Sequence, residues 1–228
     1  CKISAAITDS CFDMIRNEWL RRPGLTESQL AGNIIKFFTD RGFEEGQAFC
    51  VASGGNTNPY ARWWSDKPIR GGDLVITDIG GRGPCGGYYA DATRTHICGD
   101  ASPTPEEKKA YRETIDSVEA AIAASRPGNT SADTAKHFPV YDDDKYKTCS
   151  LFQFGHSIGL TLYEGMWISR GFSLEFPAEF KANMYMAIET YSGEPGDEQA
   201  VRLEQNVVIT DKGAVPFTLF PYDEKFLD

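Results

Sequence analysis

The sequence feature that most constrains the fold is residues 72–96, in which two aspartates, Asp78 and Asp91, lie on either side of a glycine-rich turn. β-Branched residues lead into Asp78 and tyrosines precede Asp91, and both patterns are typical of strands. Five glycines and a proline in residues 79–87 require the chain to reverse there. Two carboxylates brought side by side by a hairpin repel each other unless a cation lies between them. The hairpin therefore predicts a metal site.

The other candidate ligands lie in the second half of the chain. Oxygen-rich sites with one imidazole suit hard and borderline divalent ions, so His and Glu side chains are the ones to consider. His156 is flanked by Gly155 and Gly159, which allow the backbone to approach closely. Glu189 and Glu204 interrupt segments that are otherwise apolar and strand-like. A buried carboxylate without a partner is costly, so these two glutamates predict a shared positive charge.

The short sequence motifs around these residues resemble those of the catalytic domain of the pita-bread metallopeptidases, family M24. This family includes aminopeptidase P, prolidase, methionine aminopeptidase and creatinase. In chain order the motifs are Thr-Asp-Ile-Gly, Ala-Asp-Ala-Thr-Arg-Thr, Phe-Gly-His-Ser-Ile-Gly-Leu, Ile-Glu-Thr and Arg-Leu-Glu. The resemblance covers nearly the whole chain. It implies an α+β fold of the creatinase/aminopeptidase type, a curved antiparallel sheet covered by helices. A length of 228 residues suits one such domain, so residues 1–228 are predicted to be the catalytic domain without the separate N-terminal domain of many relatives.

The resemblance also implies a metal-dependent hydrolase with two divalent ions, drawn from Mn, Co, Zn and Fe, and a bridging hydroxide. By resemblance, Asp91 and Glu204 bridge both ions, Asp78 completes the site of one, and His156 and Glu189 complete the other. Glu189 is also the candidate catalytic carboxylate that handles the proton of the attacking water.

Two further residues are predicted to support the ligands, Thr93 and Arg202. Arg202 lies two residues before Glu204 and should therefore point to the same face of the sheet. From there its guanidinium can hydrogen-bond to a metal-binding carboxylate.

Peptidases of the family usually have a second histidine at the position that Tyr163 occupies in this chain. A tyrosine donates hydrogen bonds but does not readily shuttle protons near neutral pH. Tyr163 is therefore predicted to be a catalytic donor to the developing oxyanion. The main hypothesis is an Xaa-Pro type peptidase or dipeptidase. The alternative is a small non-peptide substrate, as in creatinase, ectoine hydrolase or a dimethylsulfoniopropionate lyase. The third hypothesis is a non-catalytic binding module.

Residues 53–64 form a loop rich in turn-forming residues, with three aromatic side chains and an arginine. Aromatic and polar groups on a loop often line a binding site. Tyr60, Arg62 and Trp63 are therefore predicted to contact the substrate, and a surface loop that covers the edge of the core is an equally weighted alternative.

The charge balance restricts the partners. The chain has 23 basic and 33 acidic residues, a net charge of -10, and no basic stripe, which argues against nucleic acid or a membrane surface as a partner. The first residues lack the pattern of a signal peptide, and the six cysteines form no Cys-x-x-Cys pair. We therefore expect a cytoplasmic enzyme with reduced thiols that acts on a small peptide or small molecule. A homodimer is expected by resemblance alone.

Local patterns predict several elements. Apolar residues four apart predict a helix over residues 3–19. Capping boxes at the start of residues 26–42 and 104–124 predict two more helices. A shorter helix is expected at residues 131–138, and a hairpin turn at residues 211–213.

Overall fold

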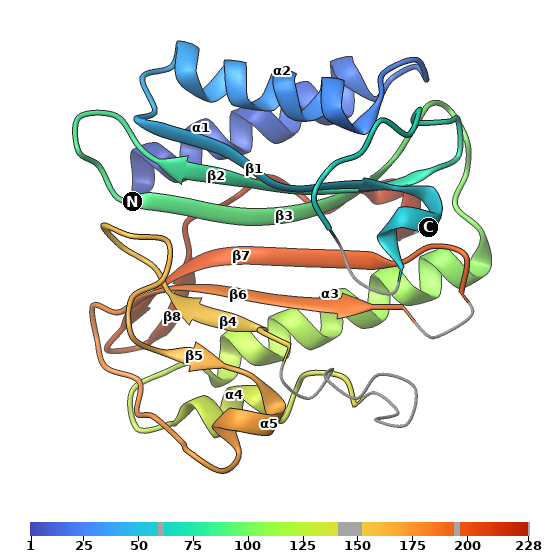
Figure 1. Ribbon diagram of the computed structural model, residues 1–228. Helices are drawn as coiled ribbons and strands as arrows, with labels where there is room; N and C mark the ends of the chain where they lie inside the picture. The colour runs from blue at the N-terminus through green and yellow to red at the C-terminus, as the bar shows by residue number, and fades with distance from the viewer. Residues whose placement is uncertain (59–61, 141–151, 194–196, 228) are drawn as a thin grey trace.

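A computed structural model describes residues 1–58, 62–140, 152–193 and 197–227 (Figure 1). Its strands are β1 (Glu45–Ser53), β2 (Leu74–Arg82), β3 (Tyr89–Ile97), β4 (Gly155–Ser157), β5 (Trp167–Ile168), β6 (Tyr185–Ser192), β7 (Val201–Thr210) and β8 (Gly213–Pro216). They form two antiparallel sheets, one of three strands in the order β1-β2-β3 and one of five in the order β5-β4-β6-β7-β8. The predicted antiparallel α+β arrangement and the hairpin turn before β8 are confirmed.

The helices are α1 (Lys2–Met14), the π-helix η1 (Ile15–Trp19), α2 (Glu27–Asp40), the 3-10 helix η2 (Gly54–Thr57), α3 (Pro105–Ala124), α4 (Ser131–Ala135), α5 (Arg170–Ser173) and the 3-10 helix η4 (Glu224–Phe226). Both predicted capping boxes, at Thr26 and Thr104, form their two hydrogen bonds. The helix expected to reach residue 138 ends at Ala135. Pro139 accounts for the exclusion of Phe138, because the residue before a proline is sterically disfavoured in a helix.

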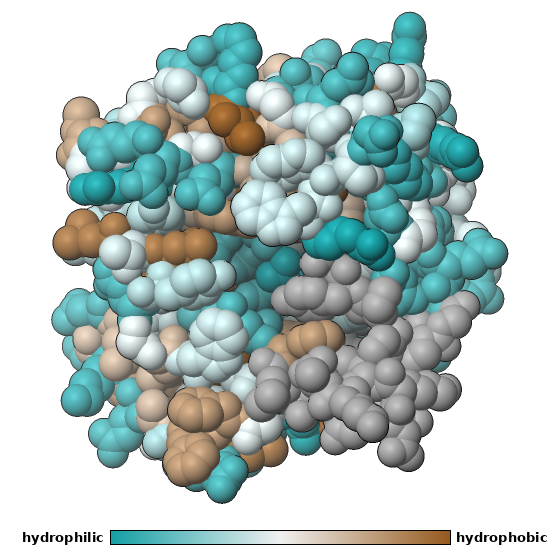
Figure 2. Space-filling model, in the orientation of Figure 1, coloured by the Kyte–Doolittle hydropathy of each residue, from teal (hydrophilic) through white to brown (hydrophobic). Residues whose placement is uncertain are grey.

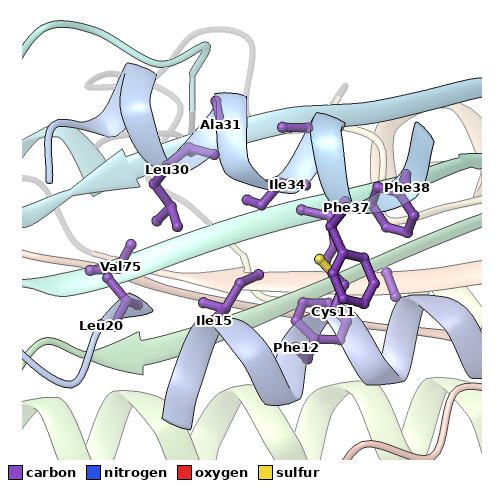
Figure 3. Packing of buried hydrophobic residues seen from close by; sticks show 14 of the residues in the cluster. Cys11, Phe12, Ile15, Leu20, Leu30, Ala31, Ile34, Phe37, Phe38 and Val75 are labelled. Carbon is purple, nitrogen blue, oxygen red and sulfur yellow. The ribbon is translucent and has the colours of Figure 1, made fainter. Parts of the chain in front are cut away.

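The helices bury one face of each sheet. In Figure 1, α1 and α2 cover the three-stranded sheet, and α3 and α4 lie against the five-stranded one. Figure 3 shows apolar side chains of α1 and α2 pointing toward each other and toward β2 in one cluster, which includes Phe12, Ile34 and Val75. A second cluster packs Val118 and Ala121 of α3 against the five-stranded sheet. These helices therefore cover one face of each sheet and leave the opposite face for other side chains.

Strand alternation places the polar residues on the other face. On β2, Val75 and Ile79 belong to the cluster under α1 and α2. Because successive side chains of a strand alternate between faces, Asp78 points away from those helices. On β7, Val207 and Ile209 pack in the cluster under α3, so Glu204 points away from it in the same manner.

The two sheets meet along β3 and β7, which lie side by side (Figure 1). Side chains, not a backbone ladder, join these strands. Asn206 accepts from the Asp91 N–H at 2.9 Å and donates to the Asp91 carbonyl at 2.5 Å. Thr95 donates to the Arg202 carbonyl at 2.8 Å and accepts from its N–H at 3.0 Å. These side-chain bonds hold the two antiparallel sheets side by side.

Five cysteines lie within the described residues, and all five are free thiols, in agreement with the prediction. The described part of the chain contains no helix long and apolar enough to cross a membrane.

His96 on β3 is a buried base without a hydrogen-bond partner. Its side chain is 2% exposed, and neither ring nitrogen has a partner among the described residues. Its ring lies 6.2 Å from that of Phe12 and 6.3 Å from that of Phe220. Burial, and secondarily Arg16 and Arg94, lowers the pKa of His96 from 6.5 to about 3. The folded protein therefore keeps this imidazole neutral.

We expect His96→Leu to weaken the loss of stability in acid. Between pH 6.5 and about 3 the unfolded chain binds a proton that the folded chain excludes, so stability falls as the pH falls through this window. The slope is at most about 1.4 kcal/mol per pH unit, or about 2 kcal/mol between pH 6.5 and roughly pH 5. Urea unfolding across this range should show a shallower decline for His96→Leu than for the wild type or for the exposed control His137→Asn. Parallel curves for all three proteins would refute the argument.

Candidate metal centre

Five predicted ligands lie on five different strands: Asp78 on β2, Asp91 on β3, His156 on β4, Glu189 on β6 and Glu204 on β7. All five side chains are buried, with exposed fractions of 1% to 6%. Glu189 and Glu204 are direct cross-strand partners. In the β2–β3 hairpin, Asp78 pairs with Thr93 and Asp91 pairs with Gly80, so the two aspartates are diagonal neighbours. Figure 2 shows a hollow with hydrophilic residues between the two halves of the molecule.

Asp91, His156 and Glu204 form the tightest group, with one ligand atom of each within 4.8 Å of the others. His156 Nε2 lies 3.2 Å from Asp91 Oδ2, and His156 Nδ1 lies 3.2 Å from the Ser157 carbonyl. A hydrogen on Nδ1 satisfies that carbonyl and leaves Nε2 with a lone pair directed at the carboxylate. Burial lowers the pKa of His156, which favours this neutral form. In this tautomer two acceptors face each other, and a cation between them would satisfy both.

Three carboxylate oxygens support the same conclusion. Asp78 Oδ1, Asp91 Oδ1 and Glu204 Oε1 are buried and have no hydrogen-bond partner among the described residues. Burial and the neighbouring carboxylates, Asp78 for Asp91 and Asp91 for Glu204, raise the pKa of both side chains well above the ordinary range. Unsatisfied buried oxygens are costly, and a divalent ion would satisfy them. Carboxylate oxygens with one imidazole fit Mn, Fe, Co or Zn.

Arg202 binds the other two carboxylates. Its Nη1 donates to Asp78 Oδ2 at 2.7 Å, its Nε donates to Glu189 Oε2 at 2.9 Å, and its Nη2 contacts the same glutamate oxygen. Thr93 donates from its hydroxyl to Glu204 Oε2 at 2.7 Å. Thr93 and Arg202 thus lie in direct contact with the candidate ligands, and each contact fixes one carboxylate oxygen so that its partner oxygen has a defined direction.

Asn206 belongs to the site although the sequence did not single it out. Asn206 hydrogen-bonds to the backbone N–H and the carbonyl of Asp91. Because Asn206 and Glu204 both lie on β7, these bonds set the position of Asp91 relative to Glu204. The available signal was its place two residues after Glu204, on the same face of β7. The contact to Asp91 spans 115 residues, so no local sequence pattern predicts it.

Tyr163 lies beside the histidine. Its ring centroid is 4.7 Å from that of His156 and 6.0 Å from that of Trp167, which is the cross-strand partner of His156. The side chain is 55% exposed and can therefore meet a bound molecule. Burial of the hydroxyl and the nearby carboxylates raise the pKa of Tyr163, so the phenol stays protonated and can donate a hydrogen bond.

The predicted substrate residues are only partly described. Tyr60 lies outside the described residues. The carbonyl of Arg62 accepts a hydrogen bond from Cys50 Sγ at 2.8 Å, and Cys50 pairs with Asp78 in the β1–β2 register. Trp63 is 67% exposed, and its ring lies 5.1 Å from that of Trp64. The Arg62 backbone is therefore next to the strand that carries Asp78, while Trp63 faces solvent.

Comparisons with known proteins identify relatives of this chain. A family model described as "Metallopeptidase family M24" matches residues 1–211. The protein named "Probable dipeptidase PepE" of Mycobacterium tuberculosis is 31% identical over 203 residues, which cover 88% of this chain and 52% of that protein. An Xaa-Pro dipeptidase of Pyrococcus furiosus is 30% identical over 157 residues, or 68% of this chain and 42% of that protein. This chain spans about half the length of these relatives.

Solved structures show the same fold. The crystal structure of dipeptidase PepE from Mycobacterium ulcerans superposes with a TM-score of 0.79 at 28% sequence identity, covering 97% of this chain and 57% of that one. The predicted pita-bread fold is thereby confirmed.

Proposed function

The chain belongs to metallopeptidase family M24, and we propose that residues 1–228 form a catalytic domain that hydrolyses Xaa-Pro peptides, dipeptides above all, with two divalent ions. The observation that carries the proposal is the set of three buried carboxylate oxygens beside His156 that have no hydrogen-bond partner among the described residues. The names of the relatives, a dipeptidase and an Xaa-Pro dipeptidase, support the substrate class. The homodimer and the cytoplasmic location stay predictions.

In this proposal Asp78, Asp91, His156, Glu189 and Glu204 hold the ions. When bound, divalent ions supply a water of lowered pKa as nucleophile and a positive charge for the carbonyl oxygen. The remaining steps belong to the residues of the chain. The carboxylate of Glu189, oriented through its Oε2 by Arg202, takes the proton of the attacking water and delivers it to the leaving amine.

Tyr163 acts on the other side of the scissile bond. Its protonated hydroxyl, beside the His156 ring, donates a hydrogen bond to the carbonyl oxygen as negative charge develops there. Thr93 keeps Glu204 in place through its bond to Oε2. Glu189, Glu204 and Thr93 are buried, which keeps bulk water away from them and strengthens their interactions.

A substrate panel tests the proposal. Protein loaded with Mn is incubated with Xaa-Pro dipeptides, with longer Xaa-Pro peptides, and with the same peptides carrying Ala in place of Pro. We expect hydrolysis of the Xaa-Pro bond that disappears after chelation. The Ala series measures the preference for proline, and the longer series measures the preference for short chains. Protein that retains its metal and cleaves no Xaa-Pro peptide would contradict the proposal.

A small non-peptide substrate is the second candidate, and Tyr163 is the observation that favours it. Peptidases of this family are expected to use a histidine at that position, and a phenol with a raised pKa does not transfer protons in the same manner. Absence of peptide cleavage in fully metal-loaded protein would favour this candidate.

We expect Tyr163→Phe to lower kcat by about 100-fold, because loss of one oxyanion donor costs on the order of 10²–10³ in kcat. Metal content should not change, since the hydroxyl is not among the proposed ligands. Steady-state kinetics with an Xaa-Pro dipeptide measure the effect, and the exposed Tyr88 supplies the matched control Tyr88→Phe. Equal kcat values for Tyr163→Phe and the wild type would remove Tyr163 from the mechanism.

A further inference from the structure

Glu27, the first residue of α2, is a fully buried carboxylate in an unusual setting. Its Oε1 accepts from the Ser53 N–H at 2.7 Å, from the Ser53 hydroxyl at 2.8 Å and from Asn56 Nδ2 at 3.0 Å. Its Oε2 accepts from the Ser65 N–H at 3.0 Å, from the Ser65 hydroxyl at 2.6 Å and from Asn56 Nδ2 at 3.2 Å. Every one of these donors lies in residues 53–65.

These contacts close a loop. Ser53 ends β1 and Ser65 lies twelve residues later, yet one carboxylate binds the backbone N–H of both. Hydrogen bonds to an ionised acceptor are roughly twice as strong as neutral ones, so the two ends of residues 53–65 are held together firmly. Lys67 reinforces the first end, because its Nζ donates to the Ser53 hydroxyl at 2.9 Å.

The same loop touches the strands of the metal centre. The Tyr191 hydroxyl donates to the Thr57 carbonyl at 3.2 Å and to Asn58 Oδ1 at 3.0 Å. Tyr191 lies two residues after Glu189 on β6 and so shares its face. On the other side of the loop, Cys50 Sγ donates to the Arg62 carbonyl beside the Asp78 strand. The loop thus contacts β6, which carries Glu189, and β1, which pairs with the strand that carries Asp78.

We propose that Glu27 is a positioning residue that holds residues 62–64 as one wall of the substrate site. The inference rests on the proposed function, because it assigns this wall to the same substrate. Glu27 contacts the loop and not the candidate ligands, so its loss should change substrate binding and leave metal binding intact. Arg62 and Trp63 would then lose their fixed positions although neither residue is altered.

The variant Glu27→Gln tests this inference. An amide has one oxygen and one NH2 group, and in either orientation the NH2 group faces donors of the loop. With an Xaa-Pro dipeptide we expect KM to rise about tenfold or more, while kcat per metal-loaded chain stays within about twofold and the metal content is unchanged. A purely structural role would lower the active fraction and leave KM unmoved. Glu107→Gln is the matched control, because Glu107 is also an N-terminal glutamate of a long helix and accepts backbone and amide hydrogen bonds.

A second variant and a proteolysis assay test the role of Glu27 where the first experiment cannot. If Glu27→Gln does not fold, Ser65→Ala removes one hydroxyl donor and keeps the carboxylate, and a smaller rise in KM is expected. If the wild type cleaves no peptide, the proposed function fails, and the rate of tryptic cleavage after Arg62 decides the inference instead. Faster cleavage in Glu27→Gln or Ser65→Ala than in the wild type and Glu107→Gln supports it. An unchanged KM, or an unchanged cleavage rate where no substrate exists, overturns it.

Discussion

Replacing Asp91 by Asn is expected to abolish metal binding and all metal-dependent activity. The residue provides one oxygen that has no partner in the described part of the chain and a second oxygen 3.2 Å from His156 Nε2, and the resemblance makes it a bridge between both ions. An amide has no charge and offers one acceptor only, so the shared positive charge would no longer be balanced. Burial and the neighbouring carboxylates raise the pKa of Asp91, so the neutral amide should leave the metal-free fold intact or stabilise it.

Metal analysis and thermal unfolding measure both parts of this prediction. A ligand present at about 100 times its Kd stabilises the folded state by about 2.7 kcal/mol, so Mn should raise the Tm of the wild type. Mn should not raise the Tm of Asp91→Asn. The control is Asp116→Asn on the exposed side of α3, which should behave as the wild type does. Full metal content and full activity in Asp91→Asn would remove this residue from the centre.

Glu189→Gln is expected to lower kcat by about 10³-fold, because general acid–base catalysis contributes on the order of 10²–10⁴. The amide oxygen can still accept from Arg202, so the local geometry should persist. Loss of the Glu189 ligand should weaken metal binding, but Asp91, His156 and Glu204 keep their ligand atoms, so protein at saturating Mn should still bind metal. Reduced kcat with metal still bound would separate the proton-handling role from the ligand role.

Steady-state kinetics and metal analysis on the same sample make that separation. Glu164→Gln, a carboxylate in the turn beside Tyr163 whose side chain accepts from the Thr161 N–H, is the control. A kcat for Glu189→Gln within a few-fold of the wild type would mean that another group handles the proton.

Local patterns in the sequence predicted a large part of this structure. The glycine-rich turn between two β-branched runs specified the β2–β3 hairpin, and the capping boxes located the starts of α2 and α3. These signals work because each depends on residues a few positions apart. The alternation of faces along β7 likewise placed Arg202 beside Glu204, and Arg202 does contact candidate ligands.

Long-range contacts account for what the sequence did not show. Asn206 reaches Asp91 across 115 residues, and Arg202 reaches Asp78 across 124. The side chain of Thr95 likewise joins β3 to β7 across 107 residues. Glu27 looked like an ordinary acidic residue in the first turn of a helix, where the helix dipole favours it. The hydrogen bonds that the Glu27 carboxylate accepts from Ser53 and Ser65 are visible only in the structure.

The measurement that tests the central claim most directly is a titration of metal-free protein with Mn, in which bound metal and hydrolysis of one Xaa-Pro dipeptide are followed in the same sample. The proposed centre predicts no hydrolysis without metal, activity that rises with bound metal, and saturation at two ions per chain. Full hydrolysis by metal-free protein, or metal that binds to Asp91→Asn as tightly as to the wild type, would contradict it.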